Sequence, residues 1–269
     1  MKFDYHVHTA FSGDCSVPME LIVQRAIRQG LEEICFTDHF DLDCTEGTDN
    51  FIFSSEKYNV AVQGLKEKYK GDISIKMGVE AGLQPHVLDE TRQFIESVPF
   101  DFVLASMHGC ERLDFYLGDY FKKYTTEEAI HHYYEEFYSM ISEYQHYSVI
   151  GHFDIYKRYS PTTMSVPFNN YKHLVEKVLK EVIKNGKGIE INTSGLRGQI
   201  NEGLPGWETV ELYKELGGRI ITLGSDSHGA DMLCANFEEV LRGLTDRGFR
   251  NIYKFDQMKP IEVPINSLL

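Results

Sequence analysis

Short apolar runs rich in β-branched residues alternate along this chain with longer amphipathic stretches. This alternation is typical of parallel βαβ units, in which each strand is followed by a helix that packs against the sheet. The expected strands cover residues 2–5, 33–37, 73–79, 101–106, 148–150, 188–192 and 219–223. The expected helices cover residues 18–29, 55–70, 87–96, 126–146, 168–185, 206–216 and 230–246. We therefore expect an α/β fold built on parallel strands.

The length of the chain suits a single barrel. An α/β barrel of this size commonly forms one domain, and 269 residues are enough for one large core. No internal repeat, low-complexity tract or Pro/Ser-rich linker divides the sequence. The hydrophobic fraction of 42% and the charged fraction of 25% are ordinary for a folded globular protein. We expect one domain that covers residues 1–269.

The charge and the cysteines argue against some classes of protein. A formal net charge of -14 does not suit a nucleic-acid partner, because binding along a phosphate backbone depends on many Lys and Arg contacts. Bound cations could cancel part of this negative charge. The five cysteines form no CxxC pair, and their odd number favours free thiols in a reducing compartment, which we take to be the cytoplasm. No apolar run approaches the roughly 18 residues that span a bilayer, so we expect no membrane segment.

Side chains that commonly bind metals follow nearly every expected strand. In a parallel α/β barrel the carboxyl ends of all strands meet on one face, so residues far apart in the sequence can share a pocket. Six of the eleven histidines lie at five of these strand ends, a concentration that chance placement does not explain. The residues at the strand ends are His6, His8, His39, Glu80, His108, His152, Asp226 and His228.

The spacing of the first two histidines supports a metal site. Residues two apart on a strand point to the same side, so His6 and His8 can bind one cation together. Imidazole and carboxylate ligands suit Zn, Mn or Fe, and the strand ends offer more ligands than one tetrahedral ion uses. We expect two to three divalent transition-metal ions.

These motifs together resemble the PHP family, the polymerase and histidinol phosphatase superfamily. The resemblance rests on HVH at 6–8, TDH at 37–39 and SDSH at 225–228, together with single residues between them. Those single residues are Asp14, Glu80, His108 and His152. The motifs follow the order of the family along nearly the whole chain. The resemblance implies a distorted (β/α)7 TIM-like barrel that holds up to three metals.

The resemblance also implies how the ligands divide among a trinuclear centre. Glu80 would bridge the first two ions. The first ion would be held by His6, His8, Glu80 and Asp226, the second by Glu80, His108 and His152, and the third by Asp14, His39 and His228.

Within the superfamily, the chain resembles the histidinol-phosphate phosphatase branch. The size of the chain and two long loops after strands, 41–54 and 110–123, agree with that branch. The resemblance implies hydrolysis of L-histidinol phosphate to L-histidinol and inorganic phosphate in histidine biosynthesis. Arg158 and Arg197 follow the fifth and sixth expected strands, and a guanidinium can bind phosphate oxygens in a bidentate way that Lys cannot copy. We expect both arginines to bind the phosphate of a small phosphomonoester.

The expected mechanism is attack of a metal-bridging hydroxide on phosphorus. Glu80, Asp226, Arg158 and Arg197 form the expected catalytic set. Asp226 or a neighbour of a histidine ligand would protonate the leaving oxygen, a choice that the sequence leaves open. A carboxylate from the long loops would meet the substrate amine, and the candidates are Asp41, Asp43, Glu111 and Asp114.

Two other functions remain open at this stage. A PHP phosphodiesterase or nuclease that acts on nucleotide or oligonucleotide substrates could use the same metals, but it needs room and positive charge for a second substituent on phosphorus. A non-catalytic metal-binding module is expected to have lost some ligands, whereas every matching position here retains one. The sequence does not predict the oligomeric state.

Overall fold

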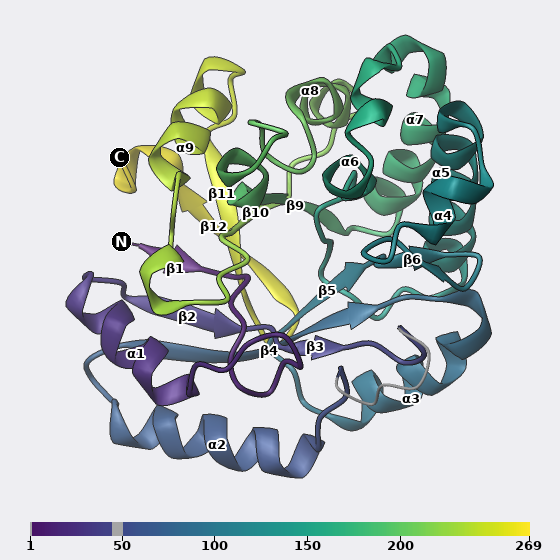
Figure 1. Ribbon diagram of the computed structural model, residues 1–269. Helices are drawn as coiled ribbons and strands as arrows, with labels where there is room; N and C mark the ends of the chain where they lie inside the picture. Colours follow the sequence, from purple (N-terminus) through teal and green to yellow (C-terminus); the bar gives the residue numbers. More distant parts are fainter. Residues whose placement is uncertain (1, 45–50) are drawn as a thin grey trace.

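Parallel strands at the centre of the molecule organise the fold (Figure 1). The computed structural model describes residues 2–44 and 51–269, so part of the expected loop 41–54 lies outside the described residues. Along the sheet, hydrogen-bonded neighbours follow one another in the order β1, β2, β4, β5, β8, β9 and β10. These strands are β1 (Phe3–Asp4), β2 (Glu33–Phe36), β4 (Ser74–Gly82), β5 (Phe102–Ser106), β8 (Val149–Ile150), β9 (Gly188–Asn192) and β10 (Ile221–Gly224).

The first and last of these strands come together and nearly close the sheet. The backbone N–H of Tyr5 donates to the carbonyl of Leu223 at 3.3 Å, and the N–H of His8 donates to the carbonyl of Ser227 at 2.9 Å. Val7 forms a parallel bridge with Ser227. The predicted distorted (β/α)7 barrel in a single domain is therefore confirmed, and the carboxyl ends of its strands lie on one face.

The strands are buried because helices cover the outside of the barrel. Every residue of β2, β5 and β9 is buried, as expected for parallel strands that are covered on both faces. The helices are α1 (Met19–Arg28), α2 (Ser55–Lys68), α3 (Leu88–Ser97), α4 (Asp119–Lys123), α5 (Thr126–Glu143), α6 (Tyr156–Tyr159), α7 (Phe168–Lys184), α8 (Trp207–Glu215) and α9 (Phe237–Asp246).

Six of the seven expected helices are present with ends close to those predicted, and the seventh is broken. The side chain of Thr125 and that of Glu128 form a reciprocal capping box at the start of α5, which satisfies two N–H groups that have no partner within the helix. The prediction of one helix over 230–246 was wrong. Cys234 and Asn236 have positive φ angles of 53° and 62°, so the chain leaves helical geometry before α9 begins at Phe237.

Several short elements were not expected from the sequence. The strand β3 (His39–Phe40) pairs with β4, and the loop after β5 contains a small hairpin of β6 (Gly109–Cys110) and β7 (Leu113–Asp114). The strand β4 runs to Gly82 rather than 79, because Glu80 pairs with both His39 and Leu104 on the neighbouring strands. Glu80 therefore lies inside a strand and is held rigidly on both sides.

A C-terminal hairpin that the sequence analysis missed covers the amino end of the barrel. The strands β11 (Asn251–Asp256) and β12 (Lys259–Pro264) are joined by Gln257 and Met258, whose φ angles of 48° and 63° fit a type I′ turn. The Tyr5 hydroxyl oxygen lies 2.9 Å from the carbonyl oxygen of Phe255 and accepts from the N–H of Phe255 at 3.0 Å. The Phe255 ring also packs against Phe102 with centroids 5.1 Å apart. The hairpin thus closes the end of the barrel opposite the metal-type residues.

All five cysteines are free in the structure. The cytoplasmic location that they favour stays a prediction. Within the described residues, none of the helices has the length and apolar character needed to cross a membrane.

The hairpin gives a stability prediction. Phe255 is 2% exposed, so Phe255→Ala should lower the free energy of unfolding by about 3–5 kcal/mol. Ile261 lies on the same hairpin and is 41% exposed, so Ile261→Ala should change it by no more than about 0.5 kcal/mol. Urea denaturation of both variants measures these differences. Equal losses in the two variants would show that the hairpin does not close the core.

Candidate metal centre

The residues predicted to bind metals converge at the carboxyl ends of the strands. They gather in groups whose potential ligand atoms lie within 4.8 Å of one another. The groups are His6, His8 and Glu80; Glu80, His108 and His152; His8, Asp14, His39 and His228; and His39, Asp41 and His108. The first three groups follow the expected division, except that His8 is shared between the first and the third and that Asp226, which was expected in the first group, is absent from it. The role of these residues as ligands stays a prediction.

Glu80 stands at the centre of this arrangement. One of its oxygens, Oε2, lies 3.1 Å from Nε2 of His6 and 3.4 Å from Nε2 of His8. The other, Oε1, lies 3.2 Å from Nε2 of His108 and 2.7 Å from Nε2 of His152. The carboxylate, which is 1% exposed, therefore serves the first group with one oxygen and the second group with the other.

Asp226 contacts the same centre from the loop that follows β10. Its Oδ1 lies 3.3 Å from Nε2 of His8 and 3.8 Å from Nε2 of His6, while its Oδ2 accepts from Arg158 at 3.2 Å and from Ser194 at 3.1 Å. Asp226 has a φ of 53°, a left-handed conformation that costs energy for a residue with a side chain. Such strain is tolerated where the surrounding structure fixes a side chain for a purpose.

The third group lies nearer the surface. Asp14 in the loop after β1 has one oxygen, Oδ2, 3.0 Å from Nε2 of His228 and 3.6 Å from Nε2 of His39. The rings of His8 and His228 stack with centroids 4.1 Å apart. Asp14 is partly exposed, so this group is open to solvent while the Glu80 groups are enclosed.

Several buried polar atoms at the centre lack partners, as a cation site requires. Among the described residues, Nε2 of His6, Nε2 of His8 and Oε2 of Glu80 make no hydrogen bond although they face one another. An unpaired buried polar atom costs on the order of 1–3 kcal/mol. Lone pairs that point at one another without hydrogen bonds are satisfied by a shared cation, so these residues fit divalent metal ions.

The second nitrogen of most of these rings is held by the protein. Nδ1 of His8 contacts Ser12 Oγ at 2.9 Å, and Nδ1 of His228 lies 3.2 Å from the carbonyl of Asp226. Nδ1 of His6 lies 2.6 Å from Glu190. Metal-binding histidines commonly use their other nitrogen in this way, because the contact fixes the orientation of the ring. The geometry therefore presents the Nε2 atoms to the ions.

Asp41 holds two of the rings and was not identified as a site residue beyond its place among the loop acids. Its Oδ1 lies 2.9 Å from Nδ1 of His108, and its Oδ2 lies 3.0 Å from Nδ1 of His39. We therefore interpret the fourth group as an orienting contact rather than a further metal site. Gly82 leaves room for it, because a Cβ there would lie 1.3 Å from Asp41 Oδ1. The available sequence signal was the run from Thr37 to Asp41, in which four of the five residues are polar although it directly follows an apolar strand.

Glu190 is a second buried carboxylate that the sequence analysis missed. It lies in β9, the strand to whose end no metal-type residue was assigned. An acidic residue within the apolar run GIEIN, two positions before Asn192 and thus on the same face, was the available signal.

The close approach of carboxylates and imidazole rings shifts the pKa values of these groups. Burial alone would raise the pKa of Glu80, but the neighbouring His6, His39 and His108 hold it well below its usual range. Burial opposes protonation of His39, yet Glu80, Asp14 and Asp41 raise its pKa to about 10. Burial, together with the nearby His39 and His228, lowers the pKa of His8 to about 3. Without cations, the carboxylates are therefore ionised and His39 holds a proton.

The two predicted arginines line one hollow beside the centre. It has a volume of about 190 Å³ and is also lined by Ser194 and Gly195 from the turn after β9. Arg158 reaches Asp226 and Ser194, whereas Arg197 donates to the carbonyl of Ser225 at 2.7 Å. Arg197 thus braces the backbone that carries Asp226. Phosphate binding by both arginines stays a prediction.

Each of the four loop acids already has a partner in the structure. Asp41 contacts His39 and His108 as described, and Asp43 contacts His86 at 2.7 Å. Glu111 contacts Lys123 and His132. Asp114 accepts from the N–H of Leu117. The carboxylate that would meet the substrate amine is not distinguished by these contacts.

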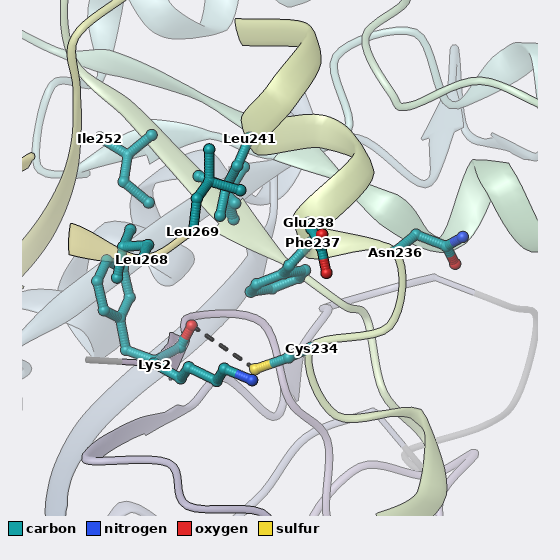
Figure 2. A pocket seen from close by; sticks show the side chains of 11 residues that line it. Lys2, Cys234, Asn236, Phe237, Glu238, Leu241, Ile252, Leu268 and Leu269 are labelled. Carbon is teal, nitrogen blue, oxygen red and sulfur yellow. Dashed lines mark hydrogen bonds between the residues drawn. The ribbon is translucent and has the colours of Figure 1, made fainter. Parts of the chain in front are cut away.

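A separate hollow lies away from the metal-type residues (Figure 2). It has a volume of about 300 Å³ and lies between β1, α9 and the C-terminal residues Leu268 and Leu269. Cys234 faces it with its sulfur 3.8 Å from the carbonyl oxygen of Phe3. The described residues that line it are mostly apolar and include no histidine, so it lacks the chemistry of the metal centre.

The PHP domain model matches residues 4–194 of this chain. The chain belongs to the PHP domain family. A histidinol-phosphatase of Lactococcus lactis subsp. lactis is 33% identical to this chain over 96% of the chain and 96% of its own length. A Clostridium acetobutylicum protein named "Probable histidinol-phosphatase" is 30% identical over 90% of this chain and 92% of its own length.

A solved structure agrees with these relatives. The crystal structure of the Lactococcus lactis histidinol phosphate phosphatase, in complex with zinc, L-histidinol and phosphate, superimposes with a TM-score of 0.88. The match covers 97% of this chain and 98% of the other at 33% identity. The resemblance to the PHP family is confirmed. The extension of the domain from residue 194 to 269 stays a prediction, because the family model ends before it.

Proton release on metal binding follows from the charges. His39 has a pKa of about 10 in the structure without cations, so at pH 7 a metal must displace its proton, whereas Glu80 has none to lose. The affinity for zinc should therefore rise with pH towards about 10, because metals bind the unprotonated imidazole. At saturating zinc, an indicator in weak buffer should record fewer protons released by the His39→Asn variant than by the wild-type protein. Equal release would contradict a protonated His39.

The space at Gly82 gives a second prediction. Gly82→Ala should displace the Asp41 carboxylate and weaken zinc binding by about 10-fold or more, since loss of an orienting contact typically costs 10–100-fold. Gly64 in α2 is a matched control, because a Cβ there meets nothing within 4 Å. Gly64→Ala should leave zinc affinity unchanged and stabilise the helix by roughly 1 kcal/mol. Competition with a chromophoric chelator measures the affinities, and unchanged affinity in Gly82→Ala would exclude an orienting role for Asp41.

Proposed function

We propose that this chain is a metal-dependent phosphatase that hydrolyses L-histidinol phosphate to L-histidinol and inorganic phosphate in histidine biosynthesis. The observation that carries this proposal is the convergence of three groups of potential ligands, two of which share Glu80. The complex of the Lactococcus lactis relative with zinc, L-histidinol and phosphate supports the substrate. The five free cysteines favour a cytoplasmic location.

The proposed cofactors are two to three divalent ions of Zn, Mn or Fe. His6, His8, Glu80 and Asp226 would hold the first, Glu80, His108 and His152 the second, and Asp14, His39 and His228 the third, with His8 near both the first and the third. When bound, such cations supply Lewis-acid chemistry, which activates a water for attack on phosphorus and neutralises charge on the phosphoryl oxygens. The hard and borderline ligands present, carboxylate oxygens and imidazole nitrogens, suit each of the three metals.

The arginines would bind and orient the phosphate. Arg158 and Arg197 line the same hollow beside Asp226, and their planar guanidinium groups match the oxygens of a phosphate. Charge that develops on those oxygens during attack is stabilised by donors that are already in place. Arg158 already pairs with Asp226. The positive charge of Arg158 is therefore balanced before the phosphate arrives.

Asp226 acts in this proposal as an ionised carboxylate. Burial would raise its pKa, but His6, His8 and Arg158 hold it well below its usual range. It therefore suits cation binding and the orientation of water better than the donation of a proton to the leaving oxygen. The group that donates that proton is left open.

The small-molecule substrate is favoured over the two rival functions. The net charge of -14 suits a substrate that carries an ammonium group, and it opposes a long nucleic-acid strand. A non-catalytic module would have no reason to keep every potential ligand together with two arginines beside them.

Loss of metal ligands tests the proposal directly. The purified protein, with its metals quantified, should release phosphate from L-histidinol phosphate and lose this activity on strong chelation. Glu80→Gln and His108→Asn should each lower kcat/KM by about 100-fold or more, because removing a group that stabilises transition-state charge typically costs 10²–10³. Turnover that survives complete metal removal, or that is unchanged in both variants, would refute the mechanism.

A comparison of substrates separates the phosphatase from the nuclease alternative. p-Nitrophenyl phosphate should be hydrolysed much faster than bis-p-nitrophenyl phosphate, because the site is expected to bind a dianionic monoester through two arginines. L-Histidinol phosphate should have the highest kcat/KM in a panel of monoesters. Faster hydrolysis of the diester would favour the phosphodiesterase.

A further inference from the structure

Glu190 is a fully buried carboxylate whose contacts extend beyond the His6 ring. It lies in the middle of β9 and is 0% exposed. In the described part of the chain its ion-pair partner is a histidine, His6, rather than a Lys or Arg. A buried carboxylate costs several kcal/mol unless its oxygens are well satisfied, so its retention in a core strand needs a reason.

The contacts of Glu190 reach both groups that share Glu80. Its Oε1 lies 2.6 Å from Nδ1 of His6 in the first group. Its Oε2 accepts from the backbone N–H of His152, in the second group, at 2.8 Å. The side chain of Asn192 donates to the same oxygen at 3.4 Å. One carboxylate thus links β9 to residues that follow β1 and β8.

Glycine makes room for this carboxylate. A Cβ at Gly224 would lie 2.0 Å from Glu190 Oε1 and 2.4 Å from the Cβ of His6. Any other residue at this position of β10 would therefore push the carboxylate and the ring apart. The contact between Glu190 and His6 therefore depends on glycine at position 224.

The contact determines which nitrogen of His6 is available. A carboxylate accepts hydrogen bonds, so Nδ1 of His6 carries a proton and Nε2 is the nitrogen left for a cation. Nε2 faces Glu80 Oε2 at 3.1 Å and Asp226 Oδ1 at 3.8 Å, two oxygens that are themselves acceptors. A cation among these three atoms satisfies all of them.

We propose that Glu190 is a positioning residue: it holds the His6 imidazole with Nε2 towards the first metal and fixes His152 at the second. This inference rests on the proposed function only in assigning metals to these groups. Carboxylate contacts of this kind also raise the basicity of an imidazole ligand, so Glu190 strengthens metal binding without touching the ion or the substrate.

The test uses two substitutions at Glu190. In Glu190→Gln the amide offers one oxygen and one NH₂ group, so it cannot accept from both His6 Nδ1–H and the His152 N–H. Glu190→Asp keeps the charge but is shorter by one methylene. Zinc affinity, measured by chelator competition, should fall by about 10–100-fold in Glu190→Gln and by less in Glu190→Asp. The visible absorption bands of the cobalt-substituted protein should also change in Glu190→Gln.

Glu33 provides a matched control. It is also a buried strand carboxylate, but it lies at the amino end of the barrel, where it accepts from Tyr5 and Ser74. Glu33→Gln should lower thermal stability and leave zinc affinity within about twofold of the wild-type value, since it orients no ligand. Raising the zinc concentration should restore kcat in Glu190→Gln, with little change in KM. Equal zinc affinity in Glu190→Gln and the wild-type protein, or an equal loss in Glu33→Gln, would overturn the proposal.

A measurement on the wild-type protein keeps the inference testable if the variants do not fold. Long-range ¹H–¹⁵N NMR of the zinc-loaded protein should show His6 protonated at Nδ1 and not at Nε2, and the opposite tautomer would overturn the proposal. Failure of the two proposals can be told apart. Weak zinc binding by Glu190→Gln supports this inference even if L-histidinol phosphate is not hydrolysed. Wild-type zinc affinity in Glu190→Gln, with L-histidinol phosphate still hydrolysed by the wild-type protein, refutes the inference while the proposed phosphatase activity stands.

Discussion

The sharing of one buried carboxylate by five imidazole rings is the interaction on which the rest of the centre depends. Glu80 lies within β4, paired on both sides to other strands, so its two oxygens have fixed positions. Rings from the segments that follow β1, β5 and β8 approach those oxygens within 2.7–3.4 Å. Because these strands are parallel and their carboxyl ends meet on one face, the barrel brings together residues as far apart in the sequence as His6 and Asp226. Strand register therefore sets the geometry of the site.

A second layer of contacts determines how the rings are used. Nδ1 of His6 faces Glu190, Nδ1 of His8 faces Ser12, and the Nδ1 atoms of His39 and His108 face Asp41. The Nε2 atoms are left to face one another and the carboxylates of Glu80, Asp14 and Asp226. Gly82 and Gly224 make the space that these contacts need. The site thus consists of potential ligands whose Nε2 atoms face inwards and of protein groups that contact the Nδ1 atoms of the same rings.

The sequence predicted the inward-facing residues well and the supporting residues poorly, for a physical reason. His6, His8 and Glu80 follow or end expected strands, so topology alone predicts that they meet. Asp41 and Glu190 act through other side chains, and their partners lie 67 and 184 positions away, so no local pattern reveals the contact. The C-terminal hairpin was missed although its apolar residues alternate, because the alternation of strands and helices along the chain predicts parallel units and not an antiparallel pair. The break before α9 depends on positive φ angles at Cys234 and Asn236, which helical periodicity does not report.

The central claim is that metal ions lie between the Nε2 atoms and that Glu80 bridges two of them. Anomalous diffraction from a crystal of the zinc-loaded protein tests it most directly. We predict zinc peaks within about 2.0–2.2 Å of the Nε2 atoms of His6, His8, His108 and His152, with each oxygen of Glu80 on a different ion. Zinc bound at Nδ1 atoms or at Asp41, or Glu80 in contact with a single ion, would contradict the account.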